Sequence, residues 1–329
     1  MSPARMDDQS AADSRVVLTG ATGFIGQYLQ RELLQSGHDV TVLVRPGSAN
    51  ADRVLPGVHV RRLELGDAGA LADALSTADY AVYAAGAVRG REPADFDAAN
   101  VTGVARFAAA ARQAMRRPRV VLISSLAATR PALSDYAASK RAGEAALRDT
   151  HGVDWVILRP SAVYGPGDRE LRPLLAAIHR GIVLRVGPRG QRLALLHAAD
   201  LARAVCAVIP HFDRCVENCY ELDDGHPLGY GWPEIVQQVR RGRRARYIPL
   251  PHALLVILAD LNLRLAIFLN RLPMLSPGKV RELSEPSWLC NNRPFIAATG
   301  WSPRIALCDG VATLFGVATH VTQSGRSDR

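Results

Sequence analysis

The sequence has few cysteines, no long uninterrupted apolar run and no apolar signal segment at its start. Its five cysteines are an odd number, in a chain of 329 residues that is too large to need disulfide staples. Cys215 and Cys219 lie close together, but no second pair stands at metal-binding spacing. We therefore expect free thiols, no disulfide bonds and no zinc or other metal site.

The two ends of the chain are polar. Residues 1–14 lack the apolar core of a secretory signal, so we expect a flexible leader and a cytoplasmic protein. Residues 320–329 predict a flexible tail. The remaining chain, which is 48% hydrophobic overall, can bury a large core in one domain or in a major and a minor one.

The charge balance is basic, with 40 Lys and Arg against 31 Asp and Glu and a net charge of +9. Nucleic acids and anionic membranes attract such proteins, but the arginines are scattered along the sequence. The one dense run, at 240–246, has no aromatic residue before Tyr247 and so lacks a stacking platform for single strands. We expect no nucleic-acid partner and interpret the run as a solvated helix end, with anion binding as the alternative.

Strand-like apolar segments alternate with helix-like segments through the first half of the chain. Strands are expected at 15–19, 39–45, 58–65, 78–84, 119–124 and 154–158, and helices at 26–35, 71–76, 96–115 and 136–149. This alternation is typical of a parallel sheet with helices on both faces. We predict an α/β fold, a Rossmann doubly wound parallel sheet with a smaller irregular C-terminal lobe.

The alternation weakens after the first half, where prolines become frequent. We assign 15–165 to a dinucleotide-binding Rossmann domain and expect 195–225, beginning with an apolar strand-like segment, to return to the main sheet. Segments 166–194 and 226–319 are expected to form a substrate-binding lobe over the carboxyl edge of the sheet. No internal repeat is visible.

One apolar segment, 253–269, is shorter than the roughly 20 residues that a membrane-spanning helix requires. It carries Asp260, Asn262 and Arg264 near its middle, where charges in a bilayer are costly. We interpret it as a helix that is buried or faces the substrate. Peripheral membrane contact, assisted by the preceding arginines, stays open as the alternative.

The strongest motif is the glycine-rich segment 19–26, which follows the first strand and opens the first helix, as a dinucleotide-binding loop requires. Gly20 permits the tight turn, Gly23 lets backbone N–H groups approach a pyrophosphate, and Gly26 allows the helix to pack closely on the strand. The helix N-terminus favours the anion. The predicted cofactor-binding residues of this loop are Gly20, Thr22, Gly23, Phe24, Ile25 and Gly26.

The second strand ends at Arg45, where NAD-binding sheets usually carry an acid for the ribose 2′-hydroxyl. A guanidinium suits a 2′-phosphate and stacks on adenine. NADP(H) is therefore favoured and NAD(H) stays open, with a solvated strand-end arginine as the alternative reading. Asp67, after the third strand, is a candidate acceptor for the adenine amino group or else a helix N-cap.

Tyr136 and Lys140 stand four residues apart and therefore share one helix face. A free tyrosine has a pKa of about 10, and a nearby ammonium together with a cationic nicotinamide would stabilise the phenolate. Tyr136 can then act as general acid or base, while Lys140 holds the nicotinamide ribose. Ser124 and Ser125, at the end of a predicted strand, offer a hydroxyl to the substrate oxygen.

These motifs resemble the extended short-chain dehydrogenase/reductase family, which includes the NAD-dependent epimerase/dehydratase and 3β-hydroxysteroid dehydrogenase branches. The resemblance extends from about residue 15 to 314 and implies an NAD(P)-dependent oxidoreductase. It implies that Ser125, Tyr136 and Lys140 are catalytic, with Ser124 able to share the role of Ser125. The further cofactor-binding residues that it implies are Ala84, Ala85, Gly86, Tyr136, Lys140, Pro160 and Val163.

The same resemblance gives Asn100 a bracing role beside the central helix and makes His197 structural rather than catalytic. Segment 190–195 lacks the acid and the aromatic residue of sugar-nucleotide members. The closing segment, 283–314, looks like the steroid-dehydrogenase and reductase branches and suggests an apolar substrate. Because many relatives pair through two helices of the main domain, a homodimer is expected by analogy only.

We predict hydride transfer between NADP(H) and a carbonyl or secondary alcohol of a largely apolar small molecule. One alternative is an NAD-dependent sugar-nucleotide epimerase or dehydratase, which retains its cofactor through the cycle. The other is a non-catalytic NADPH-binding sensor or scaffold.

Overall fold

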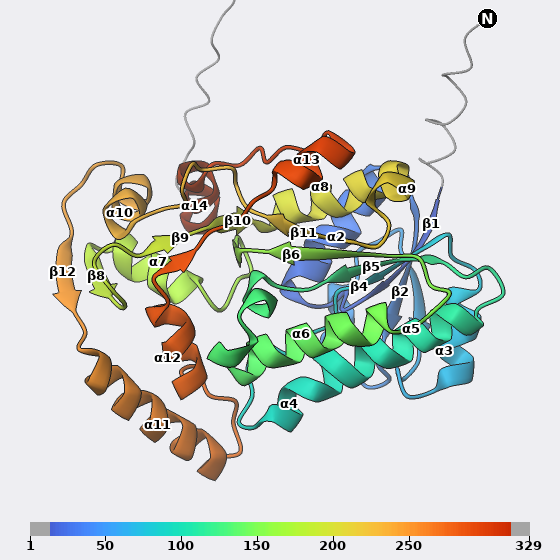
Figure 1. Cartoon of the computed structure of the whole chain (residues 1–329), viewed down its shortest axis with the longest axis horizontal. Helices are drawn as coiled ribbons and strands as arrows, with labels where there is room; N and C mark the ends of the chain where they lie inside the picture. The colour runs from blue at the N-terminus through green and yellow to red at the C-terminus, as the bar shows by residue number, and fades with distance from the viewer. Residues whose placement is uncertain (1–13, 317–329) are drawn as a thin grey trace, which may run out of the picture.

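The protein is described by a computed structural model that covers residues 14–316. Its centre is a seven-stranded sheet with the strand order β11-β6-β5-β4-β1-β2-β3, and all neighbouring strands run parallel (Figure 1). The predicted Rossmann sheet is confirmed. The expected leader, apart from Ser14, and the expected tail at 320–329 lie outside the described residues. The strands are β1 (Arg15–Thr19), β2 (Asp39–Val44), β3 (His59–Arg62), β4 (Tyr80–Tyr83), β5 (Arg119–Ile123), β6 (Trp155–Pro160) and β11 (Asn218–Leu222).

The central strands are apolar on both faces because helices cover both sides of the sheet. In the register, Leu18 of β1 lies between Val42 of β2 and Val82 of β4, and all three side chains are fully buried. One face packs against α2 (Phe24–Gln35) and α8 (Ala198–Val208). The opposite face packs against α3 (Ala68–Leu75), α5 (Gly103–Gln113) and α6 (Asp135–Arg148).

The long helix expected at 96–115 is interrupted. It consists of α4 (Pro93–Asp97), a π-helical turn η2 (Ala98–Thr102) and α5. Such π-turns often mark functional positions, and this one contains Asn100. The interruption brings the Asn100 side chain against helix α6, where its amide donates to Ser139 Oγ at 2.9 Å.

The segment that returns to the main sheet is β11, which pairs with β6 at its edge. The first apolar part of the returning region, β10 (Leu195–His197), instead pairs with β7 (Ala162–Tyr164) in a separate two-stranded parallel sheet. Of the region 195–225 expected to return to the main sheet, β10 therefore stays outside it and β11 joins it. The following helix α8 still covers the main sheet, because its apolar side packs in the same core as α2.

The C-terminal lobe consists of short helices and two further strand pairs, β8–β12 and β9–β13. Its core gathers apolar side chains from α7, α10 and α14 around Trp232 and Tyr164. The lobe elements are α7 (Arg172–His179), β8 (Ile182–Arg185), β9 (Arg192–Leu193), α10 (Trp232–Arg240), β12 (Arg246–Pro249), α11 (His252–Phe268), α12 (Pro277–Ser284), β13 (Ser287–Trp288), α13 (Arg293–Thr299) and α14 (Leu307–Phe315). The remaining short elements are η1 (Ala51–Arg53), η3 (Leu126–Thr129), η4 (Pro131–Leu133), η5 (Ile209–His211) and α9 (Phe212–Cys215).

The apolar segment 253–269 forms helix α11 at the edge of the lobe, separated from the main sheet by α12 (Figure 1). Only Leu255, Ala259 and Ala266 of this helix are buried. Burial, one of the two expectations for this segment, is therefore wrong for most of its residues, and contact with the substrate stays a prediction. Among residues 14–316, none of the helices combines the length and the hydropathy needed to cross a bilayer.

Helix α6 lies unusually close to the π-turn. A Cβ atom added to Gly143 would lie 1.9 Å from the carbonyl oxygen of Asn100. We expect Gly143→Ala to lower the free energy of unfolding by about 1–3 kcal/mol, because overpacking forces the backbone apart. Urea unfolding measures this loss. Gly190→Ala, where nothing lies within 4 Å of the added atom, is the control, and equal stability of the two variants would contradict the close packing.

Candidate active site

The glycine-rich loop packs directly against the end of β4. Gly20 has a φ of +69°, and a Cβ atom there would lie 2.6 Å from the backbone of Ala84 and Ala85. At Gly26 an added Cβ atom would lie 2.1 Å from the carbonyl oxygen of Gly20. The turn is closed by a hydrogen bond from the N–H of Gly23 to that same oxygen, at 3.0 Å. No side chain fits at Gly20 or Gly26.

Helix α2 begins at Phe24, directly after this loop. Its N-cap residue, Gly23, provides no side-chain cap, so the N–H groups of the first turn are available to an anion. Thr22, Phe24 and Ile25 are partly exposed around this helix end. The loop therefore fits a dinucleotide pyrophosphate on two counts: the backbone approaches closely, and the helix end has no side-chain cap.

The loop after β4 links the glycine-rich turn to helix α6. The hydroxyl of Thr19 accepts hydrogen bonds from the N–H groups of Ala84 and Ala85, at 3.2 and 3.3 Å. Gly86 directly follows Ala85, and a Cβ atom added to it would lie 3.2 Å from Asn100 Oδ1 and 4.0 Å from Lys140 Nζ. The predicted cofactor residues of the two loops and Lys140 therefore lie along one continuous edge of the sheet.

The segment after β6 contacts helix α2 at the carboxyl edge of the sheet. Pro160 ends β6, and Val163 lies in β7, packed against the core beneath α2. The hydroxyl of Tyr28 in α2 donates to the carbonyl oxygen of Pro166 at 2.9 Å. A Cβ atom added to Gly167 would lie 3.5 Å from the ring of Phe24. Helix α2 and this segment are thus held together across the carboxyl edge of the sheet.

The two candidates for the adenosine end differ in their surroundings. Arg45 directly follows β2 and is exposed, as a residue that reaches for a 2′-phosphate must be. Asp67 is the N-cap of α3, where its carboxylate accepts from the N–H of Ala70 at 3.0 Å. The helix-cap interpretation of Asp67 therefore describes its contact in this structure.

The structure brings Ser125, Tyr136 and Lys140 together. Ser125 follows β5 and caps the short helix η3, where its hydroxyl accepts from the N–H of Ala127 at 3.2 Å. Tyr136 lies in the first turn of α6, near enough to Ser125 for that side chain to lower the pKa of the phenol. Lys140 lies one turn further along the helix and donates to the carbonyl oxygen of Ile123, at 2.8 Å. The residues at the end of β5 thus contact both Tyr136 and Lys140 of helix α6.

Burial dominates the electrostatics of the pair in the protein alone. The expected stabilisation of the phenolate involves a bound nicotinamide and stays a prediction. Burial raises the pKa of Tyr136 to about 12, against the hydrogen bond with Ser125, which lowers it. Burial lowers the pKa of Lys140 to about 8, and Glu144 opposes that decrease. In the protein alone, Tyr136 is therefore a neutral phenol that holds its proton at neutral pH.

Two acids from the lobe side also raise the pKa of Tyr136. They are Glu282 in α12 and Glu170, which accepts a hydrogen bond from Arg89 at 2.7 Å. Sequence reasoning did not identify either residue. Both lie far from Tyr136 along the chain, and no motif marks them.

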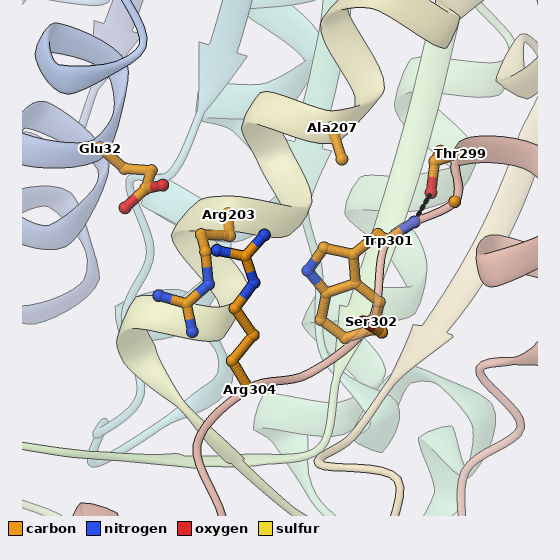
Figure 2. Close-up of a pocket in the computed structure, with 8 residues that line it drawn as sticks. Glu32, Arg203, Ala207, Thr299, Trp301, Ser302 and Arg304 are labelled. Carbon is orange, nitrogen blue, oxygen red and sulfur yellow. Dashed lines mark hydrogen bonds between the residues drawn. The ribbon is translucent and has the colours of Figure 1, made fainter. Parts of the chain in front are cut away.

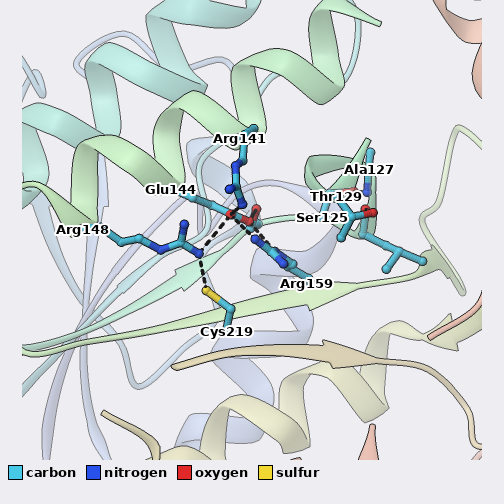
Figure 3. A network of polar contacts seen from close by, with 10 residues as sticks. Ser125, Ala127, Thr129, Arg141, Glu144, Arg148, Arg159 and Cys219 are labelled. Carbon is cyan, nitrogen blue, oxygen red and sulfur yellow. Dashed lines mark hydrogen bonds and ion pairs between the residues drawn. The ribbon is translucent and has the colours of Figure 1, made fainter. Parts of the chain in front are cut away.

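A buried ionic network lies beneath helix α6 (Figure 3). Glu144 is fully buried and accepts two hydrogen bonds from Arg159, at 2.8 and 2.6 Å. Ser124 donates to the same carboxylate at 2.6 Å. Because its hydroxyl is engaged there, Ser124 is not available to share the role of Ser125. The flanking cations, Arg141 and Arg148, lie at 3.6 and 3.5 Å from Glu144.

Asn100 and His197 both have structural contacts. The Asn100 side chain accepts from the N–H of Ala87 at 3.0 Å and donates to the carbonyl oxygen of Ala87 at 2.9 Å. His197 caps α8 by accepting from the N–H of Ala199, at 3.2 Å, and packs edge-on against Tyr28. Neither side chain joins the group formed by Ser125, Tyr136 and Lys140.

A hollow of about 300 Å³ lies between α8 and the loop after α13, away from the candidate site (Figure 2). Arg203, Trp301 and Arg304 line it, and Trp301 is held by a hydrogen bond from its N–H to Thr299 at 3.1 Å. None of the predicted cofactor or catalytic residues lines this hollow. Within the described residues, no group of three or more His, Cys, Asp or Glu side chains could hold a metal ion, and the five cysteines are free thiols.

The parallel sheet and the glycine-rich loop define a Rossmann protein of the NAD(P)-dependent oxidoreductase class. The model of the NAD dependent epimerase/dehydratase family matches residues 16–220, and the chain belongs to this family. It is an NAD(P)-dependent oxidoreductase of the extended short-chain dehydrogenase/reductase type, a family that acts on small-molecule substrates.

Two curated relatives are named as reductases. The chain is 36% identical over 305 residues to a ceramide reductase of Caulobacter vibrioides. The match covers 91% of this chain and 93% of that protein. It is 29% identical over 245 residues to a 2-alkyl-3-oxoalkanoate reductase of Stenotrophomonas maltophilia, with coverages of 65% and 72%. The crystal structure of a putative epimerase from Burkholderia cenocepacia shares the fold, with a TM-score of 0.73, 22% identity and coverages of 92% and 97%.

Removal of the buried charge of Glu144 tests the network beneath the site. We expect Glu144→Gln to lower the free energy of unfolding by about 3 kcal/mol, because Arg159 would keep its buried charge without a countercharge. Urea unfolding monitored by circular dichroism measures the change. Glu64→Gln, at an exposed carboxylate, is the matched control. A loss no larger than that of the control would show that the network contributes nothing to stability.

Proposed function

We propose that this protein uses NADPH to reduce a ketone on an alkyl-rich, largely apolar molecule, with Ser125, Tyr136 and Lys140 as its catalytic residues. The observation that carries the proposal is that the end of β5 and one face of α6 bring Ser125, Tyr136 and Lys140 together. Reduction of a ketone needs a proton donor at the oxygen that becomes a hydroxyl. A phenol that holds its proton suits this direction of the reaction.

Each of the three residues has one task in this proposal. Ser125 donates a hydrogen bond to the ketone oxygen and orients it, and Tyr136 transfers its proton to the same oxygen as negative charge develops there. Lys140, beside Gly86, holds the ribose hydroxyls and supplies positive charge near the phenol. Bound NADPH supplies the hydride. The phenol then regains a proton from solvent.

The substrate class rests on the relatives and on the lobe. The names of the two reductases describe a ceramide and a 2-alkyl-3-oxoalkanoate, which are both alkyl-rich molecules. In the segment where sugar-nucleotide members carry an acidic turn, Arg192 is paired with Glu234 at 2.7 Å. This internal pairing favours a reductase over a sugar-nucleotide epimerase.

We expect Tyr136→Phe to lower turnover by about 10²- to 10⁴-fold, because the proton donor is lost while the ring is retained. The assay follows NADPH consumption with a panel of long-chain 3-oxo compounds. NADPH binding, measured by fluorescence titration, should remain within a factor of about two to three, since packing at the site is kept.

Tyr247→Phe, at an exposed tyrosine outside the cleft, is the matched control and should leave turnover unchanged. Undiminished turnover in Tyr136→Phe would refute the assignment of the proton donor. Tightly retained NAD, with a sugar nucleotide converted and no NADPH consumed, would favour the epimerase alternative instead. NADPH binding without turnover of any ketone would favour the non-catalytic alternative.

Arg45 supports the preference for NADPH, because it is exposed at the end of β2. A charge-assisted contact with the 2′-phosphate contributes about 1.5–3 kcal/mol, so Arg45→Ala should weaken NADPH binding by roughly 10- to 100-fold. NADH binding should change little, because NADH lacks that phosphate. Fluorescence titration of both cofactors measures the ratio. Equal losses for both, or tighter binding of NADH by the unsubstituted protein, would remove Arg45 as the determinant.

A further inference from the structure

Helix α11 leaves most of its apolar side chains uncovered. Its inner residues, Leu255, Ala259 and Ala266, are buried against the lobe. Six of its exposed apolar residues recur at intervals of three and four and therefore form one stripe, while Val256 and Ile267 are exposed on another side. The stripe consists of Leu254 (44% exposed), Ile257 (57%), Leu258 (45%), Leu261 (57%), Leu265 (55%) and Phe268 (85%).

The uncovered surface extends beyond both ends of the helix. Before it, Tyr247 and Ile248 in strand β12 are exposed. After it, Leu269, Leu272 and Met274 are exposed. We call these five residues, together with the stripe on the helix, the α11 surface. Soluble proteins rarely expose a contiguous apolar surface of this kind, and where they do it usually marks an interaction site.

The polar residues of α11 do not break this surface. Asp260 and Arg264 pair with each other at 2.8 Å. Asn262 turns toward the lobe and accepts a hydrogen bond from the N–H of Leu275 at 3.2 Å. A helix that is apolar on nearly all sides normally lies in a core, yet α11 has the protein on one side only.

The charge next to this surface indicates what covers the other side. The exposed residues Arg241, Arg243, Arg244 and Arg246 precede and begin strand β12, which leads within three residues into α11 (Figure 1). The fifth arginine, Arg240, is used internally, since its guanidinium donates to the carbonyl oxygens of Ile178 and His179. The arginines adjoin Tyr247 and Ile248 at the start of β12, and this strand leads from them to α11 (Figure 1). Exposed apolar side chains that follow a cluster of arginines suit an anionic lipid surface, which takes up apolar side chains and attracts cations.

We propose that the α11 surface and the arginine cluster dock this protein onto an anionic lipid bilayer. The helix would lie in the interface and not cross it, because it has 17 residues and carries the Asp260–Arg264 pair. A second copy of the chain is the competing occupant. It is less suited, since two copies of the arginine cluster would repel each other across a symmetric contact.

Docking at this surface would place the catalytic cleft close to the bilayer. At the end of α11, the side chain of Asn270 accepts a hydrogen bond from Arg91, in the loop that follows β4. A few residues later in that segment, the ring of Phe96 lies 6.2 Å from the ring of Tyr136. This part of the inference rests on the proposed function: an alkyl-rich ketone could then pass from the bilayer to Tyr136 without crossing water.

Helix α12 provides the second connection between the docking surface and the site. It packs against α11 in a small apolar cluster with Val280 and Leu255. Its Glu282 accepts a hydrogen bond from Ser134, the N-cap residue of α6, two residues before Tyr136. The docking helix is thus joined to the catalytic helix through one intervening element.

The test is co-sedimentation of the full chain with vesicles, without substrate, so that its outcome is independent of the proposed function. Vesicles of phosphatidylcholine alone are compared with vesicles that also contain phosphatidylglycerol. We expect binding to the anionic vesicles that weakens as salt is raised. Ile257→Ser/Leu261→Ser should lower the partition coefficient by at least about tenfold. Arg243→Gln/Arg244→Gln should also lower the partition coefficient, by about fivefold for each arginine removed and therefore by about 25-fold for both.

Matched variants elsewhere on the surface keep the result specific. Met115→Ser/Leu228→Ser removes two apolar side chains that are 94% and 74% exposed on other elements. Arg61→Gln/Arg62→Gln removes two exposed charges on β3. Both should bind vesicles as the unsubstituted protein does. Equal losses in test and control variants, or no vesicle binding at all, would overturn the proposal. A dimer in sedimentation velocity that Ile257→Ser/Leu261→Ser abolishes, without vesicle binding, would assign the surface to a second copy.

Discussion

The contact between Gly143 and the carbonyl of Asn100 sets the position of helix α6, and the geometry of the site follows from that position. Because no side chain separates helix and π-turn there, α6 lies close enough for Lys140 to reach the carbonyl oxygen of Ile123 and the edge of Gly86. The same position brings Tyr136 against Ser125. The π-turn therefore connects the loop after β4 with helix α6, because Asn100 bonds to Ala87 and to Ser139.

Burial, more than any single charge, determines the proton chemistry of the cleft. It raises the pKa of Tyr136 and lowers that of Lys140, so both groups are displaced toward their neutral forms. Glu144 opposes this effect on Lys140, but its own charge is already shared with Arg159 and Ser124. The phenol remains a proton donor in the protein alone, which agrees with reduction as the proposed direction.

The lobe contributes to the site as well as covering it. Its helix α12 caps α6 through Glu282 and Ser134, and the negative charge of Glu282 helps to keep Tyr136 protonated. Its helix α11 bonds to the loop after β4 through Asn270 and Arg91. The parts of the lobe that expose apolar surface are therefore the parts attached to the cleft, so docking and catalysis are linked by short structural paths.

Local spacing in the sequence was enough to predict the parallel sheet, the glycine-rich loop and the helix face shared by Tyr136 and Lys140, because these features depend on residues a few positions apart. Tertiary structure decided what local spacing does not encode. Ser124 lies beside the buried Glu144 and donates to it, so that Ser125 is the serine that faces the site. Strand β10 pairs with β7 outside the main sheet. Contacts between distant segments also placed Glu282 near Tyr136 and left α11 uncovered. Such contacts depend on how whole elements pack, and apolar residues alone cannot specify which side of a helix the protein will cover.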